Sequence, residues 1–147
     1  MSELQGIARF EFHDGQLEEF KRLAAQGMEI VRNKDTGTLQ FEISFNDDQS
    51  ECIVLERYRD SDALIEHARN FGDLGEALIR TGWVTGELVG EPSGELKAMM
   101  ASSGIRLFTP FLSLETESAE TATRGSDEDP PAAAFDDVPL TVPRERP

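Results

Sequence analysis

Two polar side chains, Glu56 and His67, occupy positions where the surrounding pattern of residues is apolar. Glu56 falls within ECIVLERY, an apolar run typical of a strand, and shares a strand face with Tyr58. His67 lies three residues after Leu64 and four before Phe71, so it lies on the apolar stripe of the helix that follows. The spacing predicts that this carboxyl and this imidazole both point toward the interior.

If that helix packs on that strand face, Glu56 and His67 meet in the layer between sheet and helices. Burying a carboxylate beside an imidazole is costly unless the two groups are paired. In a small apolar pocket, His67 would act as a general base that takes a proton from a phenolic hydroxyl. The alternative is structural: His67 is a satisfied core or dimer-edge histidine, and Glu56 caps a turn or bonds a backbone amide.

Four further residues are candidates for the same site or for a ligand contact. Tyr58 shares the strand face of Glu56, and Asn70, one turn after Glu66, either lines the pocket or ends the helix. Trp83 packs in the core or a dimer contact, or forms a pocket wall through its indole. Arg9 neutralises Glu42 across the sheet or binds an anionic ligand.

These side chains must be positioned by an alternation of strands and helices over residues 1–115. Period-two patterns predict strands, and helical spacing with capping and glycine signals predicts helices. The expected strands are 7–13, 38–45, 51–58, 83–90 and 105–111, and the expected helices are 15–32, 61–71, 73–80 and 94–103. Asp14 is the expected N-cap of the first helix, and Asp60 or Ser61 that of the second. This order predicts a ferredoxin-like α+β fold, an antiparallel sheet with helices on one face.

The third expected strand is apolar on both faces, because Cys52 and Val54 point one way while Ile53 and Leu55 point the other. A sheet covered by helices on one side only should carry polar residues on its second face. A second copy of the chain, packed sheet against sheet, would cover that face. We therefore expect a homodimer.

Composition narrows the range of partners. The chain has 147 residues and a formal net charge of −15, so nucleic acid and anionic membrane surfaces are poor partners. No apolar run approaches the roughly 20 residues of a spanning helix. The first residues lack the pattern of a secretory signal, and the single cysteine, Cys52, lies in an apolar run and reads as a buried thiol. Together these features favour a cytoplasmic location.

The last 32 residues, 116–147, differ from the rest in composition. They hold 5 of the 7 prolines and 8 acidic residues against 3 basic ones, with few large apolar side chains. Such a segment cannot bury enough surface to offset its conformational entropy, so we expect an acidic, disordered tail. The stretch FDDVPLTVP is either part of a solubilising tail or a short docking motif.

Residues 6–91 resemble the antibiotic biosynthesis monooxygenase (ABM) domain family. GTLQFEISFNDD is similar to the family's strand after the first helix, and IVLERYRDSDALIEHARNF to its most recognisable stretch, an apolar strand ending in Glu-x-aromatic followed by a helix with Ala-Leu and His. The residues that carry this second likeness are Glu56, Tyr58, Ala63, Leu64 and His67. Tyr58 stands where the family more often has Trp.

The resemblance implies a dimeric α+β barrel and a cofactor-independent monooxygenase. The sequence contains no nucleotide-binding, zinc-protease or serine-hydrolase motif, and two histidines 54 residues apart with one cysteine make a poor metal site. We therefore expect no cofactor and no metal. A quinol or polyphenol, once deprotonated, can pass an electron to dioxygen itself, so an apolar pocket with one base suffices.

The alternative is a non-catalytic dimeric barrel that binds a small apolar ligand or a protein partner. Haem binding through His67, as in distant members of the family, is a third possibility. These alternatives make different predictions for oxygen uptake with quinols, ligand-dependent melting temperature and haem absorption.

Overall fold

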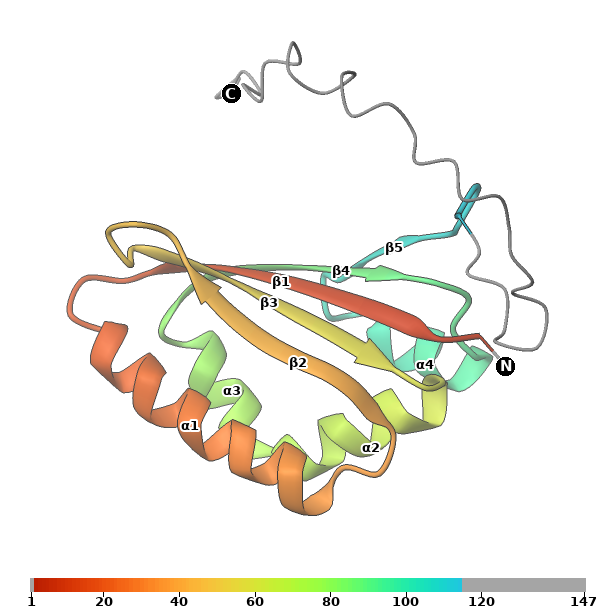
Figure 1. The fold of residues 1–147 in the computed structure, drawn as a ribbon, viewed down its shortest axis with the longest axis horizontal. Coiled ribbons are helices and arrows are strands. Elements are labelled where there is room, and N and C mark those ends of the chain that lie inside the picture. The colour runs from red at the N-terminus through yellow and green to blue at the C-terminus, as the bar shows by residue number, and fades with distance from the viewer. Residues whose placement is uncertain (1, 115–147) are drawn as a thin grey trace, which may run out of the picture. The chain divides into compact units, whose positions relative to one another are not determined.

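The computed structural model describes residues 2–114, and the residues up to Leu112 form one compact unit. Nine elements follow one another along this part of the chain (Figure 1). They are β1 (Leu4–Phe12), α1 (Leu17–Lys34), β2 (Thr38–Phe45), β3 (Glu51–Tyr58), α2 (Ser61–Phe71), α3 (Asp73–Ile79), β4 (Gly82–Val89), α4 (Gly94–Met100) and β5 (Arg106–Phe108). The predicted tail, 116–147, lies outside the described residues.

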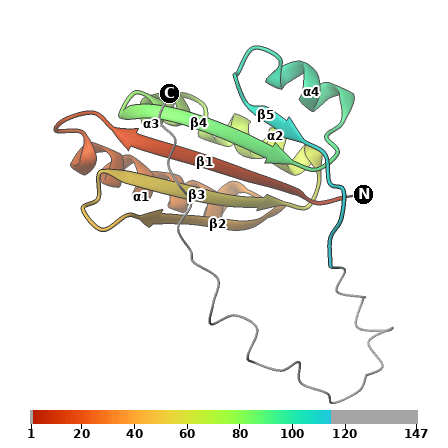
Figure 2. The same ribbon diagram turned by 90° about the horizontal axis from the view of Figure 1, so that it is seen from above.

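The five strands form one open sheet in the order β2-β3-β1-β4-β5. The central strand β1 pairs antiparallel with both neighbours, placing Phe10 opposite Cys52 on one side and Val84 on the other. Helices α1, α2 and α3 all lie against one face of this sheet (Figures 1 and 2). The predicted ferredoxin-like α+β architecture is thereby confirmed. One detail differs: β5 is an edge strand that runs parallel to β4, with Glu87 opposite Arg106.

Capping explains where α2 begins and ends. The Asp60 side chain accepts a hydrogen bond from the Ala63 amide at 2.9 Å, as predicted for an N-cap. Gly72 closes the helix with φ of 47°, a conformation that glycine adopts without steric cost. The predicted N-cap of α1 is wrong. A turn in which the Gln16 amide bonds the His13 carbonyl delays the helix, so Gln16, not Asp14, precedes its first residue.

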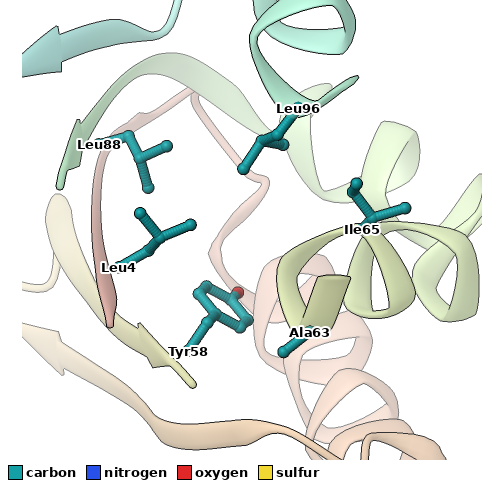
Figure 3. Packing of buried hydrophobic residues seen from close by; sticks show 6 residues of the cluster. All are labelled: Leu4, Tyr58, Ala63, Ile65, Leu88 and Leu96. Carbon is teal, nitrogen blue, oxygen red and sulfur yellow. The ribbon is translucent and has the colours of Figure 1, made fainter. Parts of the chain in front are cut away.

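The buried residues between sheet and helices fall into two clusters. One contains Leu4, Tyr58, Ala63, Ile65, Leu88 and Leu96 (Figure 3). The other contains Phe10, Phe20, Cys52 and Val54, with further aromatic side chains packed around it. Between the clusters, the helix-facing positions of β1 and β4 carry small residues, namely Gly6, Ala8 and Gly86. Their lack of bulk leaves space in the middle of the layer.

Over the described residues, no helix covers the second face of the sheet (Figure 2). That face carries the partly buried side chains of Ile7, Ile53 and Leu55 and the 65% exposed side chain of Trp83. Arg9 also lies there and pairs with Glu87 at 3.8 Å, so the predicted pairing with Glu42 is wrong. Among residues 2–114, no helix is long and apolar enough to cross a membrane.

Candidate active site

A cavity of about 550 Å³ occupies the space between the sheet and the helices. Aromatic rings form much of its wall, contributed by Phe10 and Phe41 from strands and Phe20 and Phe71 from helices. Polar groups enter this apolar lining through Glu56 on β3 and His67 on α2. An apolar pocket with a few convergent polar groups is the usual form of a small-molecule site.

His67 is buried, with 7% of its surface exposed, on the sheet-facing side of α2. Its ring centroid lies 4.2 Å from that of Phe71, one turn further along α2. The rings of Tyr58 and Phe41 lie 5.3 and 5.6 Å away on neighbouring strands. The imidazole is therefore held among three aromatic rings, and it lines the cavity.

Asp35, directly after α1, fixes the orientation of this imidazole. Its Oδ2 atom lies 2.7 Å from His67 Nδ1 and accepts a hydrogen bond from the Thr38 hydroxyl at 2.8 Å. Its Oδ1 atom accepts a hydrogen bond from the Asn70 amide at 2.8 Å. Burial alone would raise the pKa of Asp35, but the hydrogen bonds from Asn70, His67 and Thr38 outweigh that effect and lower it.

The ionisation state of Asp35 determines which nitrogen of the His67 imidazole carries no proton. With its lowered pKa, Asp35 is ionised at neutral pH and can only accept hydrogen bonds. We therefore assign the proton of neutral His67 to Nδ1, which leaves Nε2 with a free lone pair. The Nε2 atom is the one that lies on the side of Glu56. This arrangement presents a base to the cavity.

Glu56 is the second polar group of the cavity, with Oε1 4.0 Å from His67 Nε2. Burial raises the pKa of Glu56, although nearby His67 and Tyr58 oppose the shift. The side chain retains 22% exposure and lines the cavity, so its exposed part faces the space in which a ligand would bind. The site thus combines a base with a carboxyl group that holds its proton more tightly than usual.

The structure brings three of the four predicted pocket or orienting residues to His67. Glu56 lines the cavity, and Tyr58 packs its ring against the imidazole. Burial, followed by the charges of Glu56 and Asp35, raises the pKa of the Tyr58 hydroxyl, which makes no hydrogen bond of good geometry among the described residues. Asn70 does not line the cavity but holds Asp35 in place.

Trp83 is not brought to this site. It alternates with Val84, which faces the helices, so its indole projects from the opposite face of the sheet. There it contacts His13 edge-on, with ring centroids 4.3 Å apart. The geometry places Trp83 on the uncovered face and not in the wall of the cavity.

The sequence interpretation missed Asp35. It stands in the polar run NKDTG, which reads as the end of a helix, and nothing local marks it as a partner of a residue 32 positions later. Its side chain is only 2% exposed, so the distinguishing property is burial, which depends on how α1 and α2 pack. Thr38, three residues later, is the one local signal of a supporting hydrogen bond.

Other reactive groups in the described part of the chain are poorly placed for chemistry. Within residues 2–114, no group of three or more His, Cys, Asp or Glu side chains has an arrangement that could hold a metal ion. Burial raises the pKa of the Cys52 thiol to about 12, so it is no thiolate nucleophile at neutral pH. The chemistry that the site supports is therefore centred on Glu56, His67 and Asp35.

Several solved structures have a similar fold. The chain is similar to MupZ from Pseudomonas fluorescens, with a TM-score of 0.68 and 22% identity over 77% of this chain and 88% of that one. It is also similar to SnoaB from Streptomyces nogalater, described as a cofactor-independent oxygenase, with a TM-score of 0.54 and 17% identity over 63% and 96% of the two chains.

A third similar structure is a putative antibiotic biosynthesis monooxygenase from Caulobacter crescentus, with a TM-score of 0.54 and 20% identity over 62% of this chain and 91% of that one. At these identities the likeness is one of fold. No curated protein matches the sequence significantly. The model of the antibiotic biosynthesis monooxygenase family matches residues 6–71, which contain Asp35, Glu56 and His67. Residues 6–71 thus belong to the antibiotic biosynthesis monooxygenase family, as the sequence resemblance predicted.

Proposed function

We propose that this protein is a cofactor-independent monooxygenase that oxidises a quinol or related phenolic ring with dioxygen. The observation that carries the proposal is the imidazole of His67, held by Asp35 at 2.7 Å so that its other nitrogen faces an aromatic-walled cavity of about 550 Å³. Membership of the ABM family supports a monooxygenase-like activity. The description of SnoaB as a cofactor-independent oxygenase supports the same reaction class.

The first step is removal of a phenolic proton by His67 Nε2. A ring stacked among Phe41, Phe71 and the other aromatic side chains of the cavity would bring its hydroxyl to this nitrogen. The imidazolium that forms is stabilised by Asp35, because the ionised carboxylate already bonds its Nδ1–H group. Asp35 thus acts as a positioning residue for the base.

Deprotonation makes the ring electron-rich enough to pass an electron to dioxygen. Recombination of the two radicals forms a carbon–oxygen bond, and cleavage of the O–O bond leaves one oxygen atom on the ring and releases the other as water. Two protons and two further electrons for this water come from the substrate, which ends as an oxygenated quinone. The apolar walls shield the radical pair from solvent.

Glu56 is placed to orient the substrate hydroxyl. Its raised pKa keeps the carboxyl protonated to a higher pH than usual, so it can donate a hydrogen bond to a phenolate oxygen. Its position 4.0 Å from His67 Nε2 lets one substrate oxygen approach both groups from the cavity. We assign Tyr58 and Asn70 to the support of His67, through ring packing and through Asp35 respectively.

We also propose that the protein acts as a homodimer in the cytoplasm. The uncovered sheet face carries Ile7, Ile53, Leu55 and Trp83, and a second copy of the chain would remove these apolar side chains from water. In this arrangement Trp83 is a dimer contact.

Oxygen uptake with a panel of quinols tests the proposal, using His67→Asn as the decisive variant. Asparagine keeps an N–H donor for Asp35 but lacks Nε2, so the fold should survive while turnover falls by roughly 10²- to 10⁴-fold. The matched control is His13→Asn, because His13 lies outside the cavity beside Trp83. Unchanged turnover in His67→Asn would show that His67 is not the general base. A rise in melting temperature with ligand but no oxygen uptake would favour the non-catalytic alternative.

A further inference from the structure

A second, smaller cavity of about 220 Å³ adjoins the cavity that contains His67. The two cavities have a common boundary, because six residues line both: Ala8, Glu56, Gly86, Glu87, Ser103 and Ile105. Three residues of the cluster in Figure 3, Ile65, Leu88 and Leu96, form part of its wall. An apolar cavity of about 150 Å³ is enough to bind a benzene-sized molecule, so this space can hold a substantial chemical group.

The two cavities differ in the chemistry of their walls. The larger one is lined by four phenylalanines and His67, surfaces on which a flat ring stacks well. The smaller one is lined by Leu64, Ile65, Leu96, Met99 and Met100, and no aromatic residue of the described chain lines it. Flexible aliphatic and thioether side chains adapt to an alkyl chain more readily than to a rigid plane.

Small residues border the place where the two cavities meet, because Ala8 and Gly86 line both and Gly6 lines the smaller one. A Cβ atom added at Gly6 would lie 2.8 Å from Glu56 Oε2, and one added at Gly86 would lie 3.3 Å from Ile105 Cγ1. Larger side chains at Gly6 or Gly86 would therefore require Glu56 or Ile105, which line both cavities, to move. Glu56 stands at this point, so a substrate held by its polar group near Glu56 has space on both sides.

We propose that the smaller cavity is a second subsite of the same active site, which takes an aliphatic substituent of the ring bound beside His67. The substrate class is then a phenolic or quinol ring carrying an alkyl chain, with the ring among the phenylalanines and the chain between α2 and α4. This inference rests on the proposed function for the identity of the ring.

The smaller subsite depends in part on residues that follow the region matched by the family model, residues 6–71. Leu96, Met99 and Met100 lie on α4, and Ser103 and Ile105 lie on the segment that leads into β5. The appended elements thus supply part of the wall around the alkyl chain, and Leu64, Ile65 and Ala68 of the matched region supply another part. The matched region also supplies Asp35, Glu56 and His67.

Binding of a homologous ligand series tests this inference without requiring turnover. We would measure the affinity of 2-naphthol and of its 6-ethyl, 6-butyl and 6-hexyl derivatives by calorimetry under anaerobic conditions. Each methylene that enters the smaller cavity should tighten binding about fourfold, until that cavity is filled. Unsubstituted 2-naphthol reports on the ring site alone.

Ala68→Phe should abolish the dependence on chain length. Ala68 is exposed on α2 and lines the smaller cavity but not the larger one. A phenylalanine side chain at this position can therefore block the ligand's alkyl chain without contacting the site that binds the ligand's aromatic ring. Met99→Phe, at another exposed position of the same lining, is a second blocking variant should the first misfold. The matched control is Ala98→Phe, because Ala98 is exposed on α4 and lines neither cavity.

The outcomes separate the two proposals. Affinity that rises with chain length in the wild type and in Ala98→Phe, but stays flat in a blocking variant, supports the second subsite. Affinity that is independent of chain length, or that rises equally in all four proteins, overturns it while leaving the ring site intact. If the chain-length effect appears but no quinol supports oxygen uptake, the proposed function fails and the second subsite stands.

Discussion

Nδ1 of His67 lies 2.7 Å from Oδ2 of Asp35, which joins the end of α1 to the middle of α2 across 32 residues of sequence. Both side chains are almost completely buried, at 8% and 2% exposure. The pair therefore does two things at once. It gives each of two buried polar groups a hydrogen-bond partner in the layer between sheet and helices, and it turns Nε2 of the imidazole toward the cavity.

Asp35→Asn should reduce turnover while leaving the fold intact. An asparagine amide can donate to Nδ1, which would shift the imidazole proton to Nε2 and remove the free base from the cavity. We expect a loss of roughly 10²- to 10⁴-fold, comparable to loss of the base itself, because the wrong tautomer leaves no free lone pair on Nε2. Steady-state oxygen uptake as a function of pH provides the measurement.

A suitable control is Asp47→Asn, which makes the same change at an exposed position in the hairpin between β2 and β3. Equal activity of the two variants would show that Asp35 does not position the base.

Glu56→Gln should change how stability depends on pH. The raised pKa means that the folded protein keeps the Glu56 proton at pH values where the unfolded chain, with a pKa of about 4.3, has lost it. The contribution of Glu56 to the free energy of unfolding therefore declines as pH rises from that value through the raised pKa. Glutamine has no such proton, so the stability of the variant relative to wild type should increase over this range.

Chemical denaturation at several pH values from 4 upward, on the order of one unit apart, measures this difference. Glu56→Asp keeps a carboxyl group on the same face of β3, on a side chain one methylene shorter, and should retain the decline. A stability difference between Glu56→Gln and wild type that does not vary with pH would contradict the assignment of a proton to buried Glu56.

Gly27→Ala should weaken ligand binding more than it weakens the fold. A Cβ atom at Gly27 would lie 3.0 Å from Cζ of Phe71, so the ring must move. Phe71 borders the cavity, so its ring can yield into this space, and we expect the strain to be largely relieved. Alanine also favours the helix by up to about 1 kcal/mol over glycine, which offsets part of the remaining strain.

Melting temperature and 2-naphthol affinity, measured together, test this expectation. Gly94→Ala is the matched control, because an added Cβ at Gly94 meets nothing within 4 Å. The expectation fails if Gly27→Ala melts far below Gly94→Ala while binding the ligand as tightly as wild type.

Leu55→Asp should dissociate the proposed dimer. Leu55 lies on β3 and points to the uncovered face, opposite Ile7 on β1, so a charge there would be buried between two sheets. Sedimentation equilibrium would show the mass of one subunit for Leu55→Asp and of two for wild type. Gln26→Asp, at an exposed position of α1, is the control for the added charge. A wild-type mass of one subunit would refute the dimer.

Local patterns predicted most of the fold. Alternation in ECIVLERY placed Glu56 and Tyr58 on the helix-facing side of β3, and helical spacing placed His67 on the buried stripe of α2. The Asp60 cap followed equally from its position just before the helix. These predictions held because strand alternation and helix periodicity are set by backbone geometry over a few residues. The prediction that Asp14 is the N-cap of α1 was wrong because Asp14 lies inside the His13–Gln16 turn that precedes the helix.

The sequence by itself determined the order of elements, the ferredoxin-like plan and the inward direction of Glu56 and His67. Only the tertiary structure decided that Asp35 holds the imidazole, that Trp83 faces away from it, and that Gly6, Ala8 and Gly86 leave a cavity between two core clusters. The physical reason is distance along the chain. Side-chain direction follows from neighbouring residues, whereas burial, hydrogen-bond partners and empty space depend on which surfaces meet after the chain has folded.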